Sequence, residues 1–255
     1  MRILSCDIGN SSIKFGLYSE GKLLDYSRIS HEEFSHAFLA KMDFEFAAIS
    51  SVVPAVTDKL TELLETQFRI TPLIISKSSE FSLEINYETP ETLGIDRICG
   101  AEGALFLYNK ENDSNKLRQD ELVLTVDCGT ATTINVIKSP GIFSGGVIAP
   151  GLTTMMNSLN SGTAQLPKVD LFSYNQLIGS NTESCIVSGI INATLGLLER
   201  TIAELTKDNK NVITYLTGGN SDIIAQHFEK EFFHVKDLVL LGIYSLAKNY
   251  LEKNK

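Results

Sequence analysis

The amino-acid sequence predicts an α/β protein made of two related halves, each with a mixed sheet. In residues 3–18 and again in residues 122–137, an apolar strand ends in an Asp-x-Gly turn and a second β-rich strand follows at once. The aspartates of the two turns, Asp7 and Asp127, lie 120 residues apart, which is about half of the chain. In both halves, three strands precede alternating helical and strand patterns. This repetition predicts duplicated halves that face a cleft.

The first half contains short apolar runs of strand type and three amphipathic stretches of helical type. Strands are expected at residues 3–8, 12–18, 23–29, 46–51 and 73–75. Helices are expected at residues 31–41, from Pro54 to about Phe68, and at 98–108. The most polar stretch, residues 109–121, is the predicted boundary between domains 1–112 and 113–255.

The second half repeats the order of three strands followed by mixed elements. Its strands are expected at residues 122–128, 132–137, 142–149 and 212–216. A short helix should start at Pro150-Gly151-Leu152, and residues 163–178 should form a loop. Long helices are expected at 181–205, capped by Asn181 or Thr182, from 220 to about 232, and after the capping residue Asp237.

Composition limits the classes of function that fit. The 255 residues are 43% hydrophobic and 21% charged, which is usual for a globular protein, and no apolar stretch reaches the roughly 18 residues of a membrane span. A net charge of −9 argues against nonspecific binding to nucleic acid or to anionic membranes. The chain opens without a signal-peptide pattern, and its four cysteines are widely spaced without a C-x-x-C pair. A reduced, cytoplasmic protein is expected.

The two Asp-x-Gly turns suit an anionic ligand with a cation beside it. Gly129 allows the backbone to approach a ligand closely, and backbone N–H groups with the Thr130 hydroxyl can surround a phosphate. In the first copy, Lys14 follows the turn and can reach phosphate oxygens. Taken alone, each turn could equally be an ordinary β-hairpin with an exposed aspartate.

A further carboxylate, Asp96, stands next to Arg97 at an expected helix start. Without other information, this pair reads best as exposed charges at a helix end. The turn Gly218-Gly219-Asn220 follows a strand and opens a helix, as a nucleotide-binding turn does, but a plain tight turn fits it about as well. The glycines at 145, 146 and 151 could shape a cleft or only allow close packing.

Eight stretches in this order carry a family resemblance: DIGNSSIK (7–14), SSVVP (50–54), NYETPETLGIDR (86–97), VDCGTATT (126–133), GGVIAPGL (145–152), TAQLP (163–167), IGSNT (178–182) and TGG (217–219). Through them the chain resembles the type III pantothenate kinases, members of the superfamily of actin, hexokinase and the 70-kDa heat-shock ATPases. LGIDR together with VDCGTATT is the most specific part. The resemblance implies duplicated actin-like (ribonuclease H-like) domains, each with a mixed five-stranded sheet, around a nucleotide cleft.

The resemblance also implies a role for individual residues. Asp96 corresponds to the catalytic base, Asp127 to the ligand of a monovalent cation (K⁺ or NH₄⁺), and Thr130 to an ATP-binding residue. Asp7 would face Mg²⁺, directly or through water. The remaining ATP-phosphate motif would be Ile8, Gly9, Asn10, Ser11, Ser12, Ile13 and Lys14. Substrate would be bound by Tyr87, Gly94, Ile95, Asp96, Arg97 and Thr182.

The implied activity is ATP-dependent phosphorylation of the 4′-hydroxyl of pantothenate, the first step of coenzyme A synthesis, by a homodimer with shared active sites. Thr182 would act across the dimer interface, or only help to cap its own helix. Two alternatives stay open at this point: another small-molecule kinase of the superfamily, and a family-related non-catalytic accessory or regulatory protein. The run 190–196 departs from the aromatic residues and glycine of many family members, which bears on the interface or the pantothenate pocket.

Overall fold

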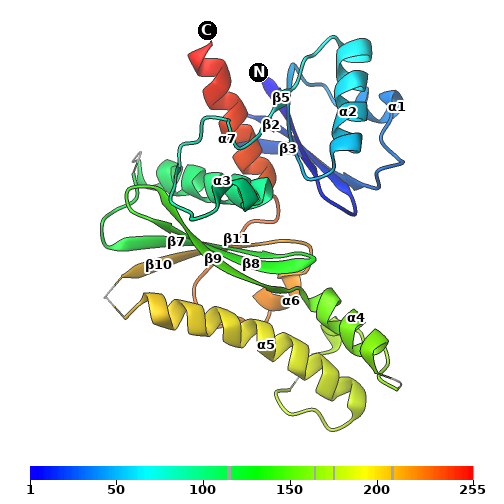
Figure 1. Cartoon of the computed structure of the whole chain (residues 1–255), viewed down its shortest axis with the longest axis vertical. Coiled ribbons are helices and arrows are strands. Elements are labelled where there is room, and N and C mark those ends of the chain that lie inside the picture. The colour runs from blue at the N-terminus through cyan, green and yellow to red at the C-terminus, as the bar shows by residue number, and fades with distance from the viewer. Residues whose placement is uncertain (114–115, 164, 175, 208–209, 255) are drawn as a thin grey trace. The chain divides into compact units, whose positions relative to one another are not determined.

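The structure, a computed structural model, describes residues 1–113, 116–163, 165–174, 176–207 and 210–254 (Figure 1). It divides into two compact units. Unit 1 comprises Met1–Leu117, Gly141–Phe143 and Asp237–Lys255, and unit 2 comprises Arg118–Pro140 and Ser144–Lys236. The division into two halves, 1–112 and 113–255, stays a prediction. The two compact units are drawn differently from these halves, since the C-terminal segment Asp237–Lys255 belongs to unit 1. Ser114 and Asn115 of the polar boundary stretch lie outside the described residues.

Unit 1 is built on a five-stranded mixed sheet. Its strand order is β3-β2-β1-β4-β5. The central strand β1 runs antiparallel to β2 and parallel to β4, and its apolar side chains are buried. The strands are β1 (Arg2–Ile8), β2 (Ile13–Ser19), β3 (Lys22–Ile29), β4 (Phe46–Ser51) and β5 (Leu73–Ile74).

The helices of unit 1 include two long ones that touch backbone to backbone. A Cβ atom added at Gly103 of α3 would lie 2.2 Å from the Leu238 carbonyl oxygen of α7, so only glycine permits this approach. All ten residues of α7 from Leu238 to Ala247 are buried. The helices are α1 (His36–Leu39), α2 (Pro54–Leu63) with a π-helical turn (Leu64–Phe68), a 3₁₀ turn (Pro90–Thr92), α3 (Ile95–Asn112) and α7 (Leu238–Lys253).

Two helix expectations in unit 1 are wrong. The helix expected at 31–41 is shorter and comprises only α1. Residues 30–33 form a turn in which the Ser30 N–H donates to the Glu33 carboxylate, so the helix begins after its cap, Ser35. Asp237 precedes α7 but makes no capping hydrogen bond; its carboxylate accepts from the buried Tyr18 hydroxyl instead.

The second sheet has strand order β11-β10-β7-β8-β9-β6, one strand more than expected. The additional strand, β6 (Glu84–Ile85), pairs with the first residues of β9, 142–143, within unit 1. β7 runs antiparallel to β8 and parallel to β10, which repeats the pattern around β1. The two mixed sheets confirm the duplicated α/β fold. The other strands are β7 (Glu121–Cys128), β8 (Ala131–Lys138), β9 (Ile142–Pro150), β10 (Asn211–Thr217) and β11 (Phe233–His234).

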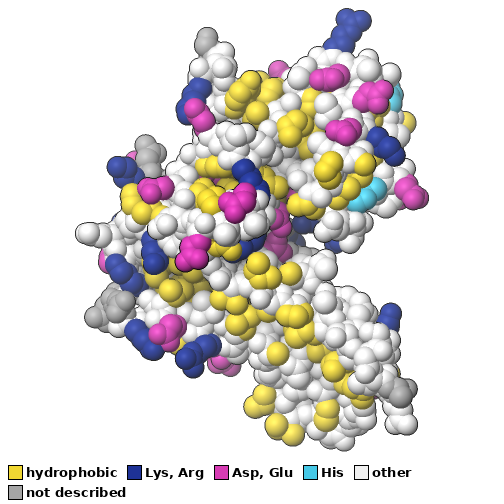
Figure 2. Space-filling view, in the orientation of Figure 1, with side chains coloured by type: hydrophobic (Ala, Val, Ile, Leu, Met, Phe, Trp, Pro, Cys, Tyr) yellow, Lys and Arg dark blue, Asp and Glu magenta, His cyan; other side chains and the backbone are white. Residues whose placement is uncertain are grey.

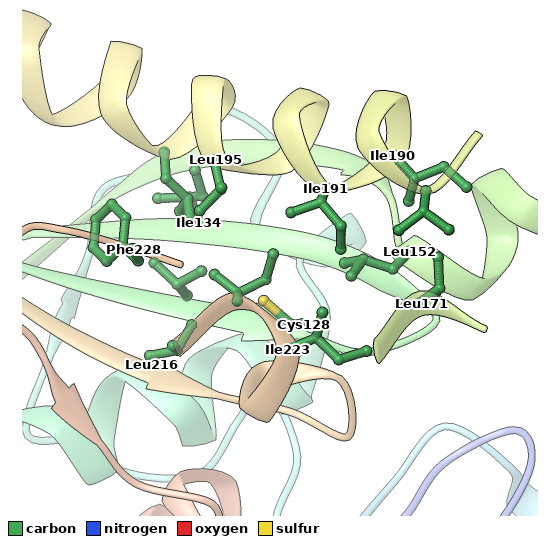
Figure 3. Close-up of a cluster of buried hydrophobic side chains, with 14 of the residues drawn as sticks. Cys128, Ile134, Leu152, Leu171, Ile190, Ile191, Leu195, Leu216, Ile223 and Phe228 are labelled. Atoms are coloured by element: carbon green, nitrogen blue, oxygen red, sulfur yellow. The ribbon is translucent and has the colours of Figure 1, made fainter. Parts of the chain in front are cut away.

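In unit 2, the long helix α5 covers one face of the sheet (Figure 1). Its residues Ile190, Ile191 and Leu195 reach the side chains of the sheet in a closely packed core (Figure 3). The expectation that no apolar stretch is long enough for a membrane span is wrong for α5, which passes that test by length and composition. Half of its most apolar 18-residue stretch is buried inside the protein, as in a core helix. The helices are α4 (Leu152–Gly162), a 3₁₀ turn (Leu171–Ser173), α5 (Thr182–Leu205) and α6 (Ser221–Ala225).

The helix expected to run to about residue 232 is wrong, since α6 ends at Ala225. The chain then adds β11 to the sheet, where Phe233 stacks on Tyr215 at 5.2 Å between ring centroids. In the expected loop 163–178, Ala164 and Asn175 lie outside the described residues, Ala164 being part of the TAQLP stretch.

Candidate active site

The first Asp-x-Gly turn lies at the carboxyl end of β1. Asp7 pairs in register with Lys14 of β2, and the Lys14 Nζ donates to Asp7 Oδ2 at 3.3 Å. The Gly9 N–H donates to the Ser12 carbonyl at 3.1 Å and closes the turn. The sequence therefore folds here into the expected carboxylate, backbone turn and lysine.

The surroundings of Asp7 raise the pKa of its carboxyl. Burial raises the pKa of its carboxyl, and the negative charge of Asp96 raises it further, while Lys14 opposes both effects. The negative charge of Asp96 thus acts on the carboxyl of Asp7, and both residues belong to unit 1.

The second turn has a similar construction. Asp127 is the last residue but one of β7, lies opposite Thr133 of β8 and is paired with Thr217 of β10. The Gly129 N–H donates to the Ala131 carbonyl at 3.1 Å, two residues on, whereas the bond that closes the first turn spans three residues. The second turn is thus one residue shorter, and both turns join an antiparallel strand pair of which the first strand also has a parallel neighbour, which supports a duplicated pair of turns.

Two glycine turns that the sequence left undecided pack against this second turn. A Cβ at Gly218, whose φ is +100°, would lie 2.3 Å from Asp127 Oδ1, so the Thr217–Gly219 turn closes over the carboxylate. A Cβ at Gly151 would lie 2.2 Å from the Gly129 carbonyl oxygen, and the Gly151 N–H donates to the Thr130 carbonyl at 3.0 Å. Both glycines are thus required by close approach to the turn.

Asp96 and Arg97 open α3 but face different surroundings. Asp96 is exposed in the first turn, and its carboxylate folds back over the N-cap residue Gly94, where a Cβ would lie 2.4 Å from Asp96 Oδ1. Arg97 is buried, and its guanidinium carbon lies 5.8 Å from the ring centroid of Tyr87 and 5.6 Å from that of Phe143. The rings hold the arginine by cation–π contacts.

Sequence reasoning missed two residues of this region. Phe143 contacts Tyr87 edge-on, with 6.1 Å between the ring centroids. The pairing of β6 with β9 brings the two residues together, and a strand of two residues such as β6 leaves almost no pattern in the sequence. Glu102, buried in α3, accepts a hydrogen bond from the Leu83 N–H at 2.9 Å. Burial raises the pKa of the Glu102 carboxyl. This bond joins α3 to the segment that carries Tyr87.

Thr182 lies at the start of α5, exposed. Asn181, not Thr182, is the cap: its Oδ1 accepts from the Ser184 N–H at 2.9 Å, and the Ser184 hydroxyl accepts from the Asn181 N–H at 3.1 Å. None of the residues that the structure describes bonds to the Thr182 hydroxyl. Among those residues there is also no group of three His, Cys, Asp or Glu side chains placed to hold a metal ion.

Comparison with solved structures defines the class of fold. A candidate Baf-family transcriptional activator from Campylobacter jejuni matches 99% of this chain and 100% of its own at 23% identity and a TM-score of 0.57. Component A of (R)-2-hydroxyglutaryl-CoA dehydratase from Acidaminococcus fermentans matches 98% of this chain and 99% of its own (12% identity, TM-score 0.51). The ROK hexokinase of Thermus thermophilus matches 99% and 100% (14% identity, TM-score 0.50). The chain shares the fold of these proteins, an α/β fold with two mixed sheets that is consistent with duplicated actin-like domains.

Comparison of sequences then identifies the family. The profile described as type III pantothenate kinase matches residues 3–204. The type III pantothenate kinase of Sulfurihydrogenibium sp. is 33% identical over 263 aligned residues, which cover 96% of this chain and 99% of the relative. That of Thermosipho africanus is 32% identical over 97% and 98% of the two chains. The chain belongs to the type III pantothenate kinase family.

Proposed function

We propose that this protein transfers the γ-phosphate of ATP to the 4′-hydroxyl of pantothenate and so forms 4′-phosphopantothenate, the first step of coenzyme A synthesis in the cytoplasm. The observation that carries the proposal is the match to this family over residues 3–204, and the effect of the Asp96 charge on the pKa of the Asp7 carboxyl supports it. The family relation supplies the substrate class, and the two carboxylates supply the chemistry of phosphoryl transfer.

Asp96 is the catalytic base of the proposal. A primary alcohol that attacks a phosphate must lose its proton, and a carboxylate within hydrogen-bond reach contributes about 10²–10⁴ in rate. Asp96 is exposed and can therefore meet a substrate. Gly94, Ile95, Arg97 and Tyr87 would bind pantothenate around it, with the buried guanidinium held between two aromatic rings as a fixed donor.

The first turn would hold the ATP phosphates. Its motif would be residues 8–13, where the turn residues Asn10, Ser11 and Ser12 lie between the paired strands, and Lys14 is a cation next to them. Mg²⁺ prefers one or two carboxylates together with phosphate oxygens and water, which fits a turn that begins beside the carboxylate of Asp7. Asp7 would contribute directly or through water, and the cation would offset the repulsion between Asp7 and Asp96.

The second turn would hold a monovalent cation and a further part of ATP. Asp127 is a half-buried strand-end carboxylate enclosed by Gly129 and Gly218, and carboxylate and carbonyl oxygens suit a hard cation such as K⁺ or NH₄⁺. The Thr130 carbonyl is occupied by the Gly151 N–H and by the Thr154 hydroxyl at 2.6 Å. This fixes the backbone of Thr130 and leaves its exposed side chain for a phosphate oxygen.

The protein would act as a homodimer in which Thr182 completes the site of the partner subunit. Its hydroxyl is exposed, and Asn181 already caps α5. Hydrophobic side chains gather on the surface of unit 2 near the start of this helix and over α4 (Figure 2). The exposed hydrophobic residues of unit 2 include Ile178 at 79%, Leu177 at 64%, Ile148 at 61% and Phe172 at 60%. A two-fold contact would bury this surface in both subunits.

A mixing experiment tests the shared site. Asp96→Asn and Thr182→Ala chains, each inactive alone, are co-expressed with different tags. If Thr182 acts in the partner's site, a mixed dimer has one intact site and one site with both changes, so activity returns to about a quarter of the wild-type value. If purified mixed dimers regain no activity, the shared site is wrong.

The activity itself is tested with an acceptor panel. ADP formation from ATP is followed with pantothenate, with glucose and without acceptor. The proposal expects ADP only with pantothenate. ADP formed with glucose would indicate another kinase of the fold, and no ADP with any acceptor would indicate an accessory protein.

A further inference from the structure

A second cation, Arg28, lies beside the first turn. β3 pairs with β2 so that Arg28 is directly opposite Lys14. Directly opposite residues of an antiparallel pair project from the same face of the sheet. The two positive side chains therefore emerge together at the end of the sheet where the Gly9–Ser12 turn begins.

The charge of Lys14 is balanced within the protein, whereas that of Arg28 is not. Lys14 has the carboxylate of Asp7 at 3.3 Å. Arg28 donates from Nε to the Ser12 hydroxyl at 2.9 Å and forms no ion pair with any residue that the structure describes. Like charges directly opposite each other destabilise a strand pair, so this arrangement favours an anion next to Arg28.

The turn is also held in place from the same side. His31, two residues after β3, donates from Nε2 to the Gly9 carbonyl at 2.8 Å. Arg28 holds the other end of the turn through Ser12. Since the Arg28 Nε is used by Ser12, the two terminal nitrogens of the guanidinium keep their N–H donors, in the planar arrangement that binds phosphate oxygens in pairs.

We propose that Arg28 is a phosphate-contacting residue of the ATP site, anchored by Ser12 and directed at the phosphate oxygens beyond the α-phosphate. This rests on the proposed function only in taking the first turn as the nucleotide-phosphate site. The competing role is purely mechanical, with Arg28 bracing Ser12 and touching no ligand.

The test is equilibrium binding of MgATP, MgADP and AMP to the whole protein by calorimetry. Arg28→Gln should weaken MgATP and MgADP about 10- to 100-fold, the usual effect of losing a hydrogen bond to a charged group, and should change AMP binding little. Arg28→Lys, which keeps the charge but not the fork, should lie between Gln and wild type. Lys22→Gln is the matched control, because it removes the same charge from the opposite end of β3 and should leave all three affinities unchanged.

A double-mutant cycle with Ser12→Ala separates contact from bracing. Direct contact predicts that Arg28→Gln weakens MgATP more than Ser12→Ala does, and that the double variant is weaker than Ser12→Ala alone. Equal losses in all three variants would overturn the contact, and so would wild-type affinity in Arg28→Gln. Thermal unfolding of each variant shows whether it is folded. Because binding is measured without acceptor, failure of the pantothenate reaction in the wild type would be a separate result.

Discussion

Replacing Gly103 by alanine should separate α3 from α7 and destabilise unit 1. The new Cβ would stand 2.2 Å from the Leu238 carbonyl oxygen and 3.0 Å from the Gly242 nitrogen, both of them backbone atoms that cannot rotate away. A carbon and a carbonyl oxygen normally approach no closer than about 3.3 Å, so the helices must part by about 1 Å. Such overpacking costs about 1–3 kcal/mol, which lowers the melting temperature by about 2–4 °C for each kcal/mol in a chain of this size.

Gly100 provides the control on the same helix. A Cβ at Gly100 would meet only the Val239 Cγ2 at 3.8 Å, an ordinary contact. Gly100→Ala should therefore leave stability unchanged or raise it by up to about 1 kcal/mol through helix propensity. Urea and thermal unfolding of both variants measure the difference. If Gly103→Ala is as stable as Gly100→Ala, α3 and α7 do not approach each other as closely at Gly103 as the structure shows.

Three further predictions concern the site. Asp96→Asn should lower kcat about 10²–10⁴-fold with ATP binding little changed, and near wild-type turnover of the folded variant would reject the base. Exchange of K⁺ for Na⁺ or for a bulky organic cation at equal ionic strength should remove most activity, and Asp127→Ala should be inactive in every salt. Equal wild-type rates in all salts would instead indicate that Asp127 is a magnesium ligand. Burial raises the pKa of the Glu102 carboxyl in the folded protein, so ionisation of Glu102 opposes folding. The free energy of unfolding should therefore fall as the pH rises from the ordinary pKa of a glutamate to the raised pKa. Glu102→Gln keeps an acceptor for the Leu83 N–H and should raise the melting temperature at neutral pH and flatten its pH dependence, whereas an unchanged profile would exclude this contribution.

The paired strands and their turns could be predicted from the sequence because their signals are local. An apolar strand, Asp-x-Gly and a returning strand stand within 16 residues in both copies, and the register of β1 with β2 and of β7 with β8 follows directly. The start of α5 was predicted as well, with Asn181 or Thr182 as its cap, and the structure decides for Asn181. The fold class followed from the repetition of these local patterns.

Apart from the local turn that shortens α1, the errors and omissions at Asp237, Phe143 and Glu102 come from contacts between distant parts of the chain. Asp237 has the sequence position of a helix cap, yet its carboxylate accepts from Tyr18, more than two hundred residues away in sequence. Phe143 joins Tyr87 only through the two-residue strand β6, and Glu102 looks like a surface residue until Leu83 is placed against it. Tertiary pairing decided each of these positions, and no local pattern encodes it.

The central claim is tested most directly by identifying the reaction product. The purified protein is incubated with MgATP, K⁺ and pantothenate, and the phosphorus NMR spectrum and mass of the organic product are recorded beside those of the Asp96→Asn variant. A phosphate monoester on the 4′-oxygen of pantothenate, formed by the wild type and lost in the variant, is the expected result. Unmodified pantothenate after complete incubation of the folded, ATP-binding wild-type protein would contradict the assignment.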